Sequence, residues 1–460
     1  MATLESYVEA LIAELTRIQA PGSVPEPDEE GFSFPGQIAV GNDRFIMTTR
    51  EMERLIELSS RELKRGDPVL SRSNTDKEWN WTVRGAFGPA LMLIDLDDDR
   101  QENARTVVAA IRAAVSGPSK THGPVEHAFG CTLFGNFDVA PFSIGPVQFE
   151  PRSAWLARKL SDGAVSKTTA QRVMRVWSGG KPRKRKTSVD SIRERDILDA
   201  VGKCPYVCSV RTEGLASEAG RLKAQTAARL ALTGIALRWA VSSRALDGFR
   251  LLVDPSVRRQ RSLVFKPKVR TLSGGHLMGL PHGPNISPGD WAKELAKNRG
   301  DFDVVGEAIT YYLSRDGKVA RPALMNTFAQ ALLWFHEGCR DEVELMAVVK
   351  FSACLDALAS GGRSNGIRSL IRARLGMQDD KTIRKDGPTM HQAVEEIYSS
   401  GRSRTIHGTN DKIGNDWSST RALAEQFARI CLVMSLDWAV SNPTSDDPLA
   451  LKKVNEQGKP

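Results

Sequence analysis

Two residues near the C-terminus, Arg402 and His407 in the segment GRSRTIHG, have side chains suited to acid–base and phosphate chemistry. Histidine titrates near neutral pH, so it can accept or donate a proton during a reaction. Arginine stays protonated and can hold the non-bridging oxygens of a phosphate while negative charge builds up on them.

The spacing of Arg402 and His407 argues against a self-contained pair. Five positions on a straight α-helix place two side chains roughly 140° apart. The predicted helix before Gly401 has an apolar stripe over residues 390–398, and continuing it in the same register would place Ile406 on the opposite side of the helix. We therefore expect the regular helix to break or change face at Gly401. A phosphate at a helix end could still reach both side chains, or a second chain could supply a second pair. The alternative is a charged helix end, because the macrodipole favours cations there whatever the function.

Asp356 is a carboxylate inside the most apolar predicted helix, residues 341–360. An ionised carboxylate in such a place is costly unless it is paired. Arginine is the preferred partner, because its planar guanidinium donates two hydrogen bonds at once. Arg402 is one candidate for this partner. Arg363 and Arg368 are the others, and a position at an exposed edge of the bundle would need none.

These segments together resemble the Apea-like branch of the HEPN ribonuclease superfamily. The family's pattern of arginine, serine, three variable residues, histidine and glycine is matched by Arg402, Ser403, His407 and Gly408. Its earlier leucine–acid–small–leucine signature is matched at residues 355–358, with Asp356 where the family usually has glutamate. ALLWFHEG, at residues 331–338, is similar to the helix that precedes this signature. The resemblance covers residues 323–438.

The resemblance implies a metal-independent endoribonuclease without a cofactor, acting on RNA such as tRNA or mRNA. It implies a homodimer in which two copies of Arg402 and His407 face one phosphate, with Ser403 orienting His407 or contacting the phosphate and Asp356 supporting Arg402. The product would be a 2′,3′-cyclic phosphate. Phage defence or a regulated toxin, with a phage-derived or other trigger, is the role that the family suggests. The alternative function is a non-catalytic RNA- or protein-binding module whose bundle serves dimerisation.

Charge also favours a nucleic-acid partner over a membrane. The chain of 460 residues has a formal net charge of +9 and a hydrophobic content of 41%, typical of a globular protein. The strongest basic run, KPRKRK, could follow an RNA backbone or be a flexible solvated loop. The predicted nucleic-acid contacts are Lys181, Arg183, Lys184, Arg185, Lys186 and Arg404. Further basic residues, at positions 258–270, fall on predicted strands.

The first 300 residues predict an α+β fold. The periodicity indicates helices at residues 4–18, 49–63, 101–115 and 217–242, and strands at 90–96, within 130–151, at 206–211 and within 249–275. A linker at 21–31 is acidic and contains proline. We therefore expect a sensor or recognition region over 1–300, with two lobes at about 32–178 and 188–300.

The remainder predicts an all-α, HEPN-like bundle over residues 301–442, followed by a flexible tail at 443–460. Its helices are expected at residues 322–338, 341–360, 366–375 and 389–399, and from Ser418 to the stop at Asn442 and Pro443. Short connections between helices are typical of a bundle.

Two further motifs contain residue types that can bind metals. Asp95 and Asp97 end the predicted strand at 90–96 and could hold magnesium, but a turn before a helix explains them as well. Cys204 and Cys208 have the wrong spacing for a zinc knuckle, so we expect buried free thiols. Without a signal peptide or a long apolar run, the sequence predicts a cytoplasmic protein and no membrane partner.

Overall fold

The computed structural model describes residues 3–22, 36–116, 122–135, 139–254, 260–266, 269–276 and 283–454, and only the backbone between residues 260 and 276. Most of the predicted linker at 21–31 lies outside these residues. The same holds for the side chains of the basic residues predicted on strands at 258–270.

The chain forms two compact units that differ from the predicted lobes. Unit 1 comprises Met1–Val125, Thr212–Lys223 and Ser314–Asp316. Unit 2 comprises Glu126–Arg211, Ala224–Leu313 and Gly317–Pro460. The main segment of unit 1 therefore ends at Val125, well before the end of the first predicted lobe at about residue 178. The second predicted lobe belongs almost entirely to the unit that contains the C-terminal helices.

Unit 1 is mainly helical. Its elements are α1 (Leu4–Gln19), β1 (Gly36–Gly41), β2 (Arg44–Thr48), α2 (Arg50–Arg65), α3 (Pro68–Ser73), α4 (Asp76–Leu91) and α5 (Arg100–Ser116). Side-chain oxygens of Thr3, Thr49 and Thr75 cap α1, α2 and α4, satisfying amides that have no partner inside the helix. The predicted helices at 4–18, 49–63 and 101–115 are confirmed.

The predicted strand at residues 90–96 is wrong. Ala90 and Leu91 are the buried last residues of α4, and residues 92–99 form the turn into α5. The apolar run continues the helical stripe of Val83 and Phe87, so its buried part has a period of 3.6. A capping box between Thr75 and Glu78 begins this helix.

The antiparallel hairpin of β1 and β2 packs closely against α4 at Gly88. A Cβ at this position would lie 1.9 Å from the carbonyl oxygen of Ala39 in β1. On the same helix, Gly85 is exposed and a Cβ there would meet nothing within 4 Å. Gly88 therefore allows the contact between helix and hairpin, whereas Gly85 has no such task.

Replacing these two glycines should have opposite effects. We expect Gly88→Ala to lower the free energy of unfolding by about 1–3 kcal/mol, because the added methyl overlaps a backbone oxygen. Gly85→Ala should raise it by up to about 1 kcal/mol, since alanine is the better helix former. Urea denaturation of both variants measures this, and equal stability of the two would contradict the contact.

Unit 2 is built on a five-stranded sheet, counted over the described residues, with strand order β4-β5-β6-β3-β7. Its strands are β3 (Val125–Thr132), β4 (Phe142–Ile144), β5 (Val147–Pro151), β6 (Tyr206–Thr212) and β7 (Arg250–Leu251). β8 (Gln260–Lys266) and β9 (Val269–His276) pair separately. The strands predicted at 206–211, within 130–151 and within 249–275 are confirmed.

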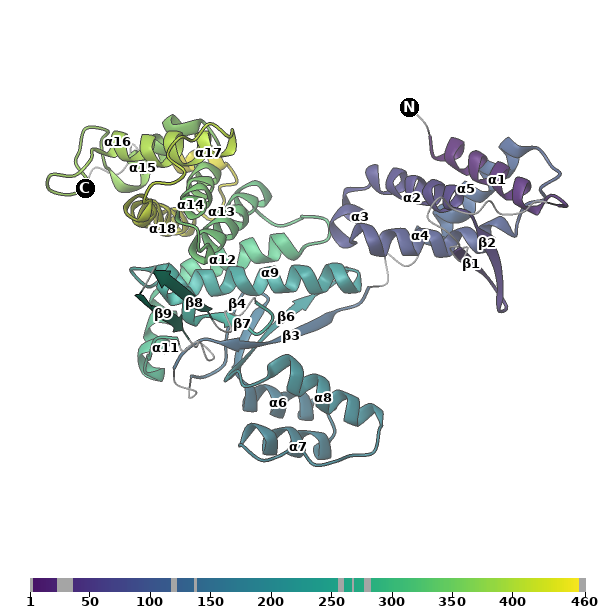
Figure 1. Ribbon diagram of the computed structural model, residues 1–460, viewed down its shortest axis with the longest axis horizontal. Helices are drawn as coiled ribbons and strands as arrows, with labels where there is room; N and C mark the ends of the chain where they lie inside the picture. The colour runs from purple at the N-terminus through teal and green to yellow at the C-terminus, as the bar shows by residue number, and fades with distance from the viewer. Residues whose placement is uncertain are drawn as a thin grey trace. The chain divides into compact units, whose positions relative to one another are not determined.

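Three helices between β5 and β6 form a lobe of their own, α6 (Arg152–Ser161), α7 (Lys167–Trp177) and α8 (Val189–Val201) (Figure 1). Trp155, Val173 and Ile197 are buried at their centre. Arg158 of α6 links the lobe to the sheet: it hydrogen-bonds to Glu126 of β3 at 3.1 Å and to Glu150 of β5 at 2.6 Å. We call these helices the three-helix insert.

The remaining elements are helical. They are α9 (Ser217–Ala236), α10 (Ser242–Gly248), α11 (Pro288–Lys297), α12 (Arg299–Leu313), α13 (Pro322–Arg340), α14 (Glu344–Leu358), α15 (Arg363–Leu375), α16 (Met390–Glu395), the π-helix η2 (Glu396–Ser403), α17 (Arg404–Ile406), α18 (Ser418–Ser441) and the 3-10 helix η3 (Pro448–Lys452). The predicted order, an α+β region followed by a helical bundle, is confirmed. Its likeness to HEPN domains stays a prediction.

The bundle does not have a core separate from the sheet. One continuous cluster of buried side chains includes Phe149 in the sheet, Ile235 in α9 and Leu355 in α14. The predicted boundary at residue 301 therefore does not divide two hydrophobic cores. Nor is the described part of the tail flexible, because Leu451 is fully buried and Lys452 donates to the carbonyl of Ala359.

The ion pairs of Glu126, which link the sheet to the three-helix insert, should stabilise the fold less at acidic pH. Burial opposes ionisation of Glu126, but hydrogen bonds from Arg158 and Lys159 outweigh it and lower its pKa to about 2. A carboxyl with a lowered pKa stabilises the fold above its unfolded pKa of about 4.3, and this is lost as pH falls towards 2. Glu126→Gln should therefore cost about 1–3 kcal/mol at pH 7 and about half as much at pH 3.

The measurement is urea denaturation at pH 7 and at pH 3. The exposed Glu342 provides the matched control, Glu342→Gln. A cost of Glu126→Gln that does not change with pH would show that the carboxylate charge is not what stabilises this junction.

Candidate phosphate-binding site in the helical bundle

The candidate site lies where η2 packs against α14. α14 is apolar nearly all round, as predicted, and Val348, Ser352 and Leu355 are fully buried. Asp356 lies two turns after Val348, on the same side of the helix. This side of α14 faces η2, as the contacts at Gly401 and Arg402 show.

Of the two predicted possibilities at Gly401, a break or a change of face, the structure has the second. The chain passes from α16 into η2, where the amide of Arg404 donates to the carbonyl of Ser399, five residues earlier. Gly401 is buried, and a Cβ there would lie 2.6 Å from Cγ1 of Val348. The glycine thus permits close approach to α14. The wider π-helical turn changes the facing of the chain without interrupting the helix.

Arg402 forms an ion pair with Asp356, the first of the predicted partners. Arg402 Nη2 lies 3.2 Å from Asp356 Oδ2, and the two side chains are 24% and 21% exposed. The guanidinium also lies over the ring of Tyr398, 5.2 Å from its centroid. The alternative partner Arg368 is taken up elsewhere, by Asp379 and His391.

Three polar atoms at this junction are left without a hydrogen-bond partner in the ranges that the structure describes. Asp356 Oδ1, Arg402 Nε and Ser352 Oγ are buried and have no hydrogen-bond partner among the described residues. A guanidinium has five N–H donors, and the ion pair with Asp356 engages only Nη2. Arg402 is thus oriented by an acid and an aromatic ring while keeping donors for an anion.

His407 ends the short helix α17 and is exposed. Its amide donates to the carbonyl of Ser403 at 3.0 Å, and Gly408 follows with a φ of +70°. Within the described part of the chain, no hydrogen bond or ion pair joins the side chains of Arg402, Ser403 and His407. The structure therefore places the three on one continuous helical segment but does not connect them.

The surface around His407 is partly apolar. Ile406 is 58% exposed and Ile413 is 72% exposed. Asn410 holds this loop by donating to Thr405 Oγ1 at 2.7 Å, and Arg404 lies 3.4 Å from Asp411 on the surface. α17 and the loop after it thus each present one isoleucine to solvent.

The basic run at 181–186 lies in the three-helix insert, not in the bundle. Its members differ in their surroundings. Arg185 is paired with Glu194 at 3.0 Å and Asp190 at 3.1 Å, so it is a structural residue. The exposed members are Lys181, Arg183, Lys184 and Lys186.

The aspartates at 95–99 and the two cysteines at 204 and 208 have structural roles. Asp95 Oδ1 accepts the amide of Asp97, and Asp99 caps the first turn of α5 by accepting from Glu102. Cys204 and Cys208 are buried free thiols, as predicted, and burial raises the pKa of Cys204 to about 11.

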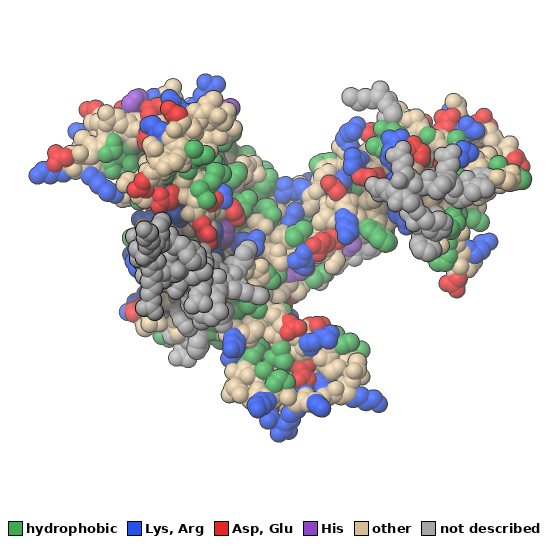
Figure 2. Space-filling model, viewed as in Figure 1, with side chains coloured by type: hydrophobic (Ala, Val, Ile, Leu, Met, Phe, Trp, Pro, Cys, Tyr) green, Lys and Arg blue, Asp and Glu red, His purple; other side chains and the backbone are tan. Residues whose placement is uncertain are grey.

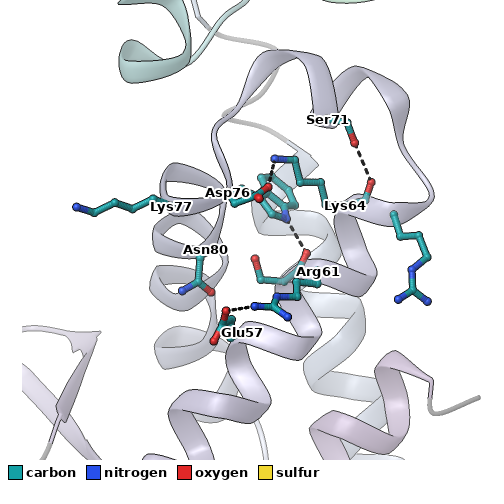
Figure 3. Close-up of a pocket in the computed structure, with 10 residues that line it drawn as sticks. Glu57, Arg61, Lys64, Ser71, Asp76, Lys77 and Asn80 are labelled. Carbon is teal, nitrogen blue, oxygen red and sulfur yellow. Dashed lines mark hydrogen bonds and ion pairs between the residues drawn. The ribbon is translucent and has the colours of Figure 1, made fainter. Parts of the chain in front are cut away.

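One basic pocket in unit 1 has no counterpart in the sequence analysis. It has a volume of about 510 Å³ and is lined by residues of α2, α3 and α4, including Arg61, Lys64 and Lys77 (Figure 3). Two of these cations are neutralised inside it, because Arg61 pairs with Glu57 and Lys64 lies 2.7 Å from Asp76. Most of its positive charge is therefore already paired.

Two features of the bundle site were missed from the sequence. Tyr398 lies four residues before Arg402, and this spacing brings two side chains together on a helix. It could have revealed the stacking of Arg402 on Tyr398. The π-helical turn has no comparable signal. The turn contains Gly401, which packs closely on Val348 of α14.

Comparison with known proteins does not test the resemblance to HEPN ribonucleases. No family model matches the chain, and no match was found among curated proteins or solved structures. In the described residues, no single helix is long and apolar enough to span a membrane. α14 and α15 pass that test only together, bent by 69°.

The contact between Gly401 and Val348 can be tested with a double-mutant cycle. Gly401→Ala should lower the free energy of unfolding by about 1–3 kcal/mol, because its methyl overlaps Val348. Val348→Ala removes the obstructing methyl groups at a cost of about 2 kcal/mol. The double variant should cost at least about 0.5 kcal/mol less than the sum of the two. Strict additivity in urea denaturation would contradict the close approach of η2 to α14.

Proposed function

We propose that the protein is a metal-independent endoribonuclease whose active site is built from Arg402, Ser403 and His407 of two chains. The observation that carries this proposal is the oriented, partly exposed guanidinium of Arg402, paired with Asp356 and stacked on Tyr398. An arginine held in this way has less conformational freedom left to lose on binding a phosphate than a mobile arginine has.

The chemistry follows from the side chains. A neutral imidazole takes the proton of the 2′-hydroxyl as its oxygen attacks the adjacent phosphorus, and the bond to the 5′-oxygen breaks. A protonated imidazole gives its proton to that leaving oxygen. The products are a 2′,3′-cyclic phosphate and a 5′-hydroxyl. Arg402 stabilises the added negative charge on the phosphate oxygens in between.

A second chain completes the proposed site. One His407 cannot be both acid and base in the same step, and its side chain has no described contact with Arg402. Two-fold pairing would bring two of each to one phosphate. The exposed Ile406 and Ile413 beside His407 supply apolar surface for such an interface. Because cleavage of cellular RNA harms the host, regulation as a defence protein or toxin fits this activity.

The alternative is a non-catalytic module in which the bundle dimerises or binds RNA or protein. The same exposed isoleucines support it, and Arg402 could serve there as a structural ion pair. The two proposals differ in what His407 does. Only the enzyme needs its imidazole.

The test is incubation of the purified protein with total RNA in EDTA, followed by analysis of the RNA ends. We expect the wild type to produce cyclic phosphate ends, and Arg402→Ala and His407→Ala to lower the rate at least about 100-fold. Arg402→Lys should also be impaired, since it keeps the charge but not the planar donor set.

Two exposed residues of the same bundle give matched controls, Arg384→Ala and His391→Ala, which should cleave like the wild type. Equal cleavage by all variants would refute the site. Cleavage only with magnesium would refute the mechanism. The absence of cleavage by the wild type, with binding intact, would favour the non-catalytic module.

A further inference from the structure

The exposed side of α7, in the three-helix insert, carries residues that can read or hold a polyanion. Lys167, Thr168, Gln171 and Arg175 are exposed. Positions 168, 171 and 175 share one face of a helix. α7 contains no aspartate or glutamate in any position. Its N-terminal end, which attracts anions, thus carries no acidic residue of its own in the first turn.

The loop after α7 is fixed rather than loose. Arg172 of α7 donates to the carbonyl oxygen of Arg183 and pairs with Glu194 of α8 at 2.6 Å. Arg185 spans the same helices through Thr169 and Glu194. Two arginines therefore hold the loop against the insert.

Anchoring of the loop leaves its other cations free. Among the described residues, no hydrogen bond or ion pair involves the side chains of Lys181, Arg183, Lys184 and Lys186. In Figure 2, Lys and Arg side chains gather along the lower edge of this lobe, where Figure 1 has α7 and the following loop. The acidic side chains visible on this lobe lie away from that edge.

α7 itself is held rigidly at both ends. Ser166 caps its N-terminus and donates to Asp190 Oδ2 at 2.8 Å. At its C-terminus, Arg152 lies over the Trp177 ring and donates to the Trp177 carbonyl at 3.0 Å. Val173 is fully buried between these ends. The exposed face is thus presented in one orientation, which lowers the entropic cost of binding.

We propose that α7 and residues 178–188 form a docking surface for duplex DNA, with α7 in the major groove. The major groove of B-DNA admits an α-helix. Arginine and glutamine are the side chains that pair with guanine and adenine edges there, and threonine can contact the thymine methyl. Lys181, Arg183, Lys184 and Lys186 follow as phosphate contacts, as basic residues that flank a reading helix do.

Duplex RNA fits this surface less well, because the deep major groove of an A-form helix is too narrow for side chains to read. Single-stranded RNA is bound mainly by stacking on aromatic rings, and the exposed face of α7 has none. The proposal does not rest on RNA cleavage, since none of the surface residues belongs to the bundle site.

The test is fluorescence anisotropy of the full-length protein with a labelled 20-base-pair DNA duplex of mixed sequence at several salt concentrations. The loop variant Lys181→Ala/Lys184→Ala should lower the slope of log affinity against log salt by about two, one for each lost phosphate contact. The helix variant Gln171→Ala/Arg175→Ala should weaken binding about tenfold or more.

The charge control is Lys203→Ala/Lys297→Ala, which removes two exposed cations elsewhere in unit 2 and should bind like the wild type. Unchanged unfolding midpoints exclude loss of fold, because the substituted side chains are exposed. If the control variant loses as much affinity for DNA as the other two variants, binding is due to general charge attraction and the proposal is overturned. Tighter binding of single-stranded or duplex RNA of the same sequence, or no binding of DNA, would overturn it too.

Discussion

The ion pair between Asp356 and Arg402 is the interaction on which the bundle site depends. A carboxylate in the most apolar helix of the protein has to be paired, and one partner reaches it from η2. That requirement fixes how far η2 must approach α14, and the approach is possible only because residue 401 has no side chain. The ion pair, the close approach at Gly401 and the guanidinium over Tyr398 are thus parts of one junction between η2 and α14.

Buried polar links attach this bundle to the sheet side of unit 2. His336 of α13 lies 2.9 Å from Thr233 of α9 through its Nδ1 atom. Burial, with neighbouring arginines, lowers the pKa of His336 to about 3, so it stays neutral at physiological pH. Glu425 of α18 accepts from the amide and hydroxyl of Ser243 in α10. With the shared hydrophobic core, these links brace α13 and α18, between which α14 is packed.

The sequence predicted much of this because its strongest signals are local. Helical stripes and caps located α13, α14 and α18, and the cost of an unpaired carboxylate predicted a partner for Asp356. The predictions were wrong where tertiary contacts determine the secondary structure or the extent of a hydrophobic core. Residues 90–96 read as a strand because a short apolar run has no period of its own, and only packing in unit 1 shows that its first residues close a helix. The division at residue 301 failed because a change from strands to helices need not separate two cores. The roles of Arg402 and His407 stay predictions, since neither spacing nor the geometry of one chain brings them together.

The π-helical turn also limits which lengths of this segment are compatible with the site. A turn of η2 holds one residue more than an α-helical turn, so the chain could lose one residue between Ser399 and Ser403 and still remain helical. The bond across five residues would then become the bond across four residues of an α-helix, so residues after the turn, His407 among them, would keep their facing. The residues within the turn, Gly401 and Arg402 among them, would shift against α14. A related chain without the extra residue could therefore keep the bundle and the direction of its histidine while losing the pairing of the arginine with Asp356.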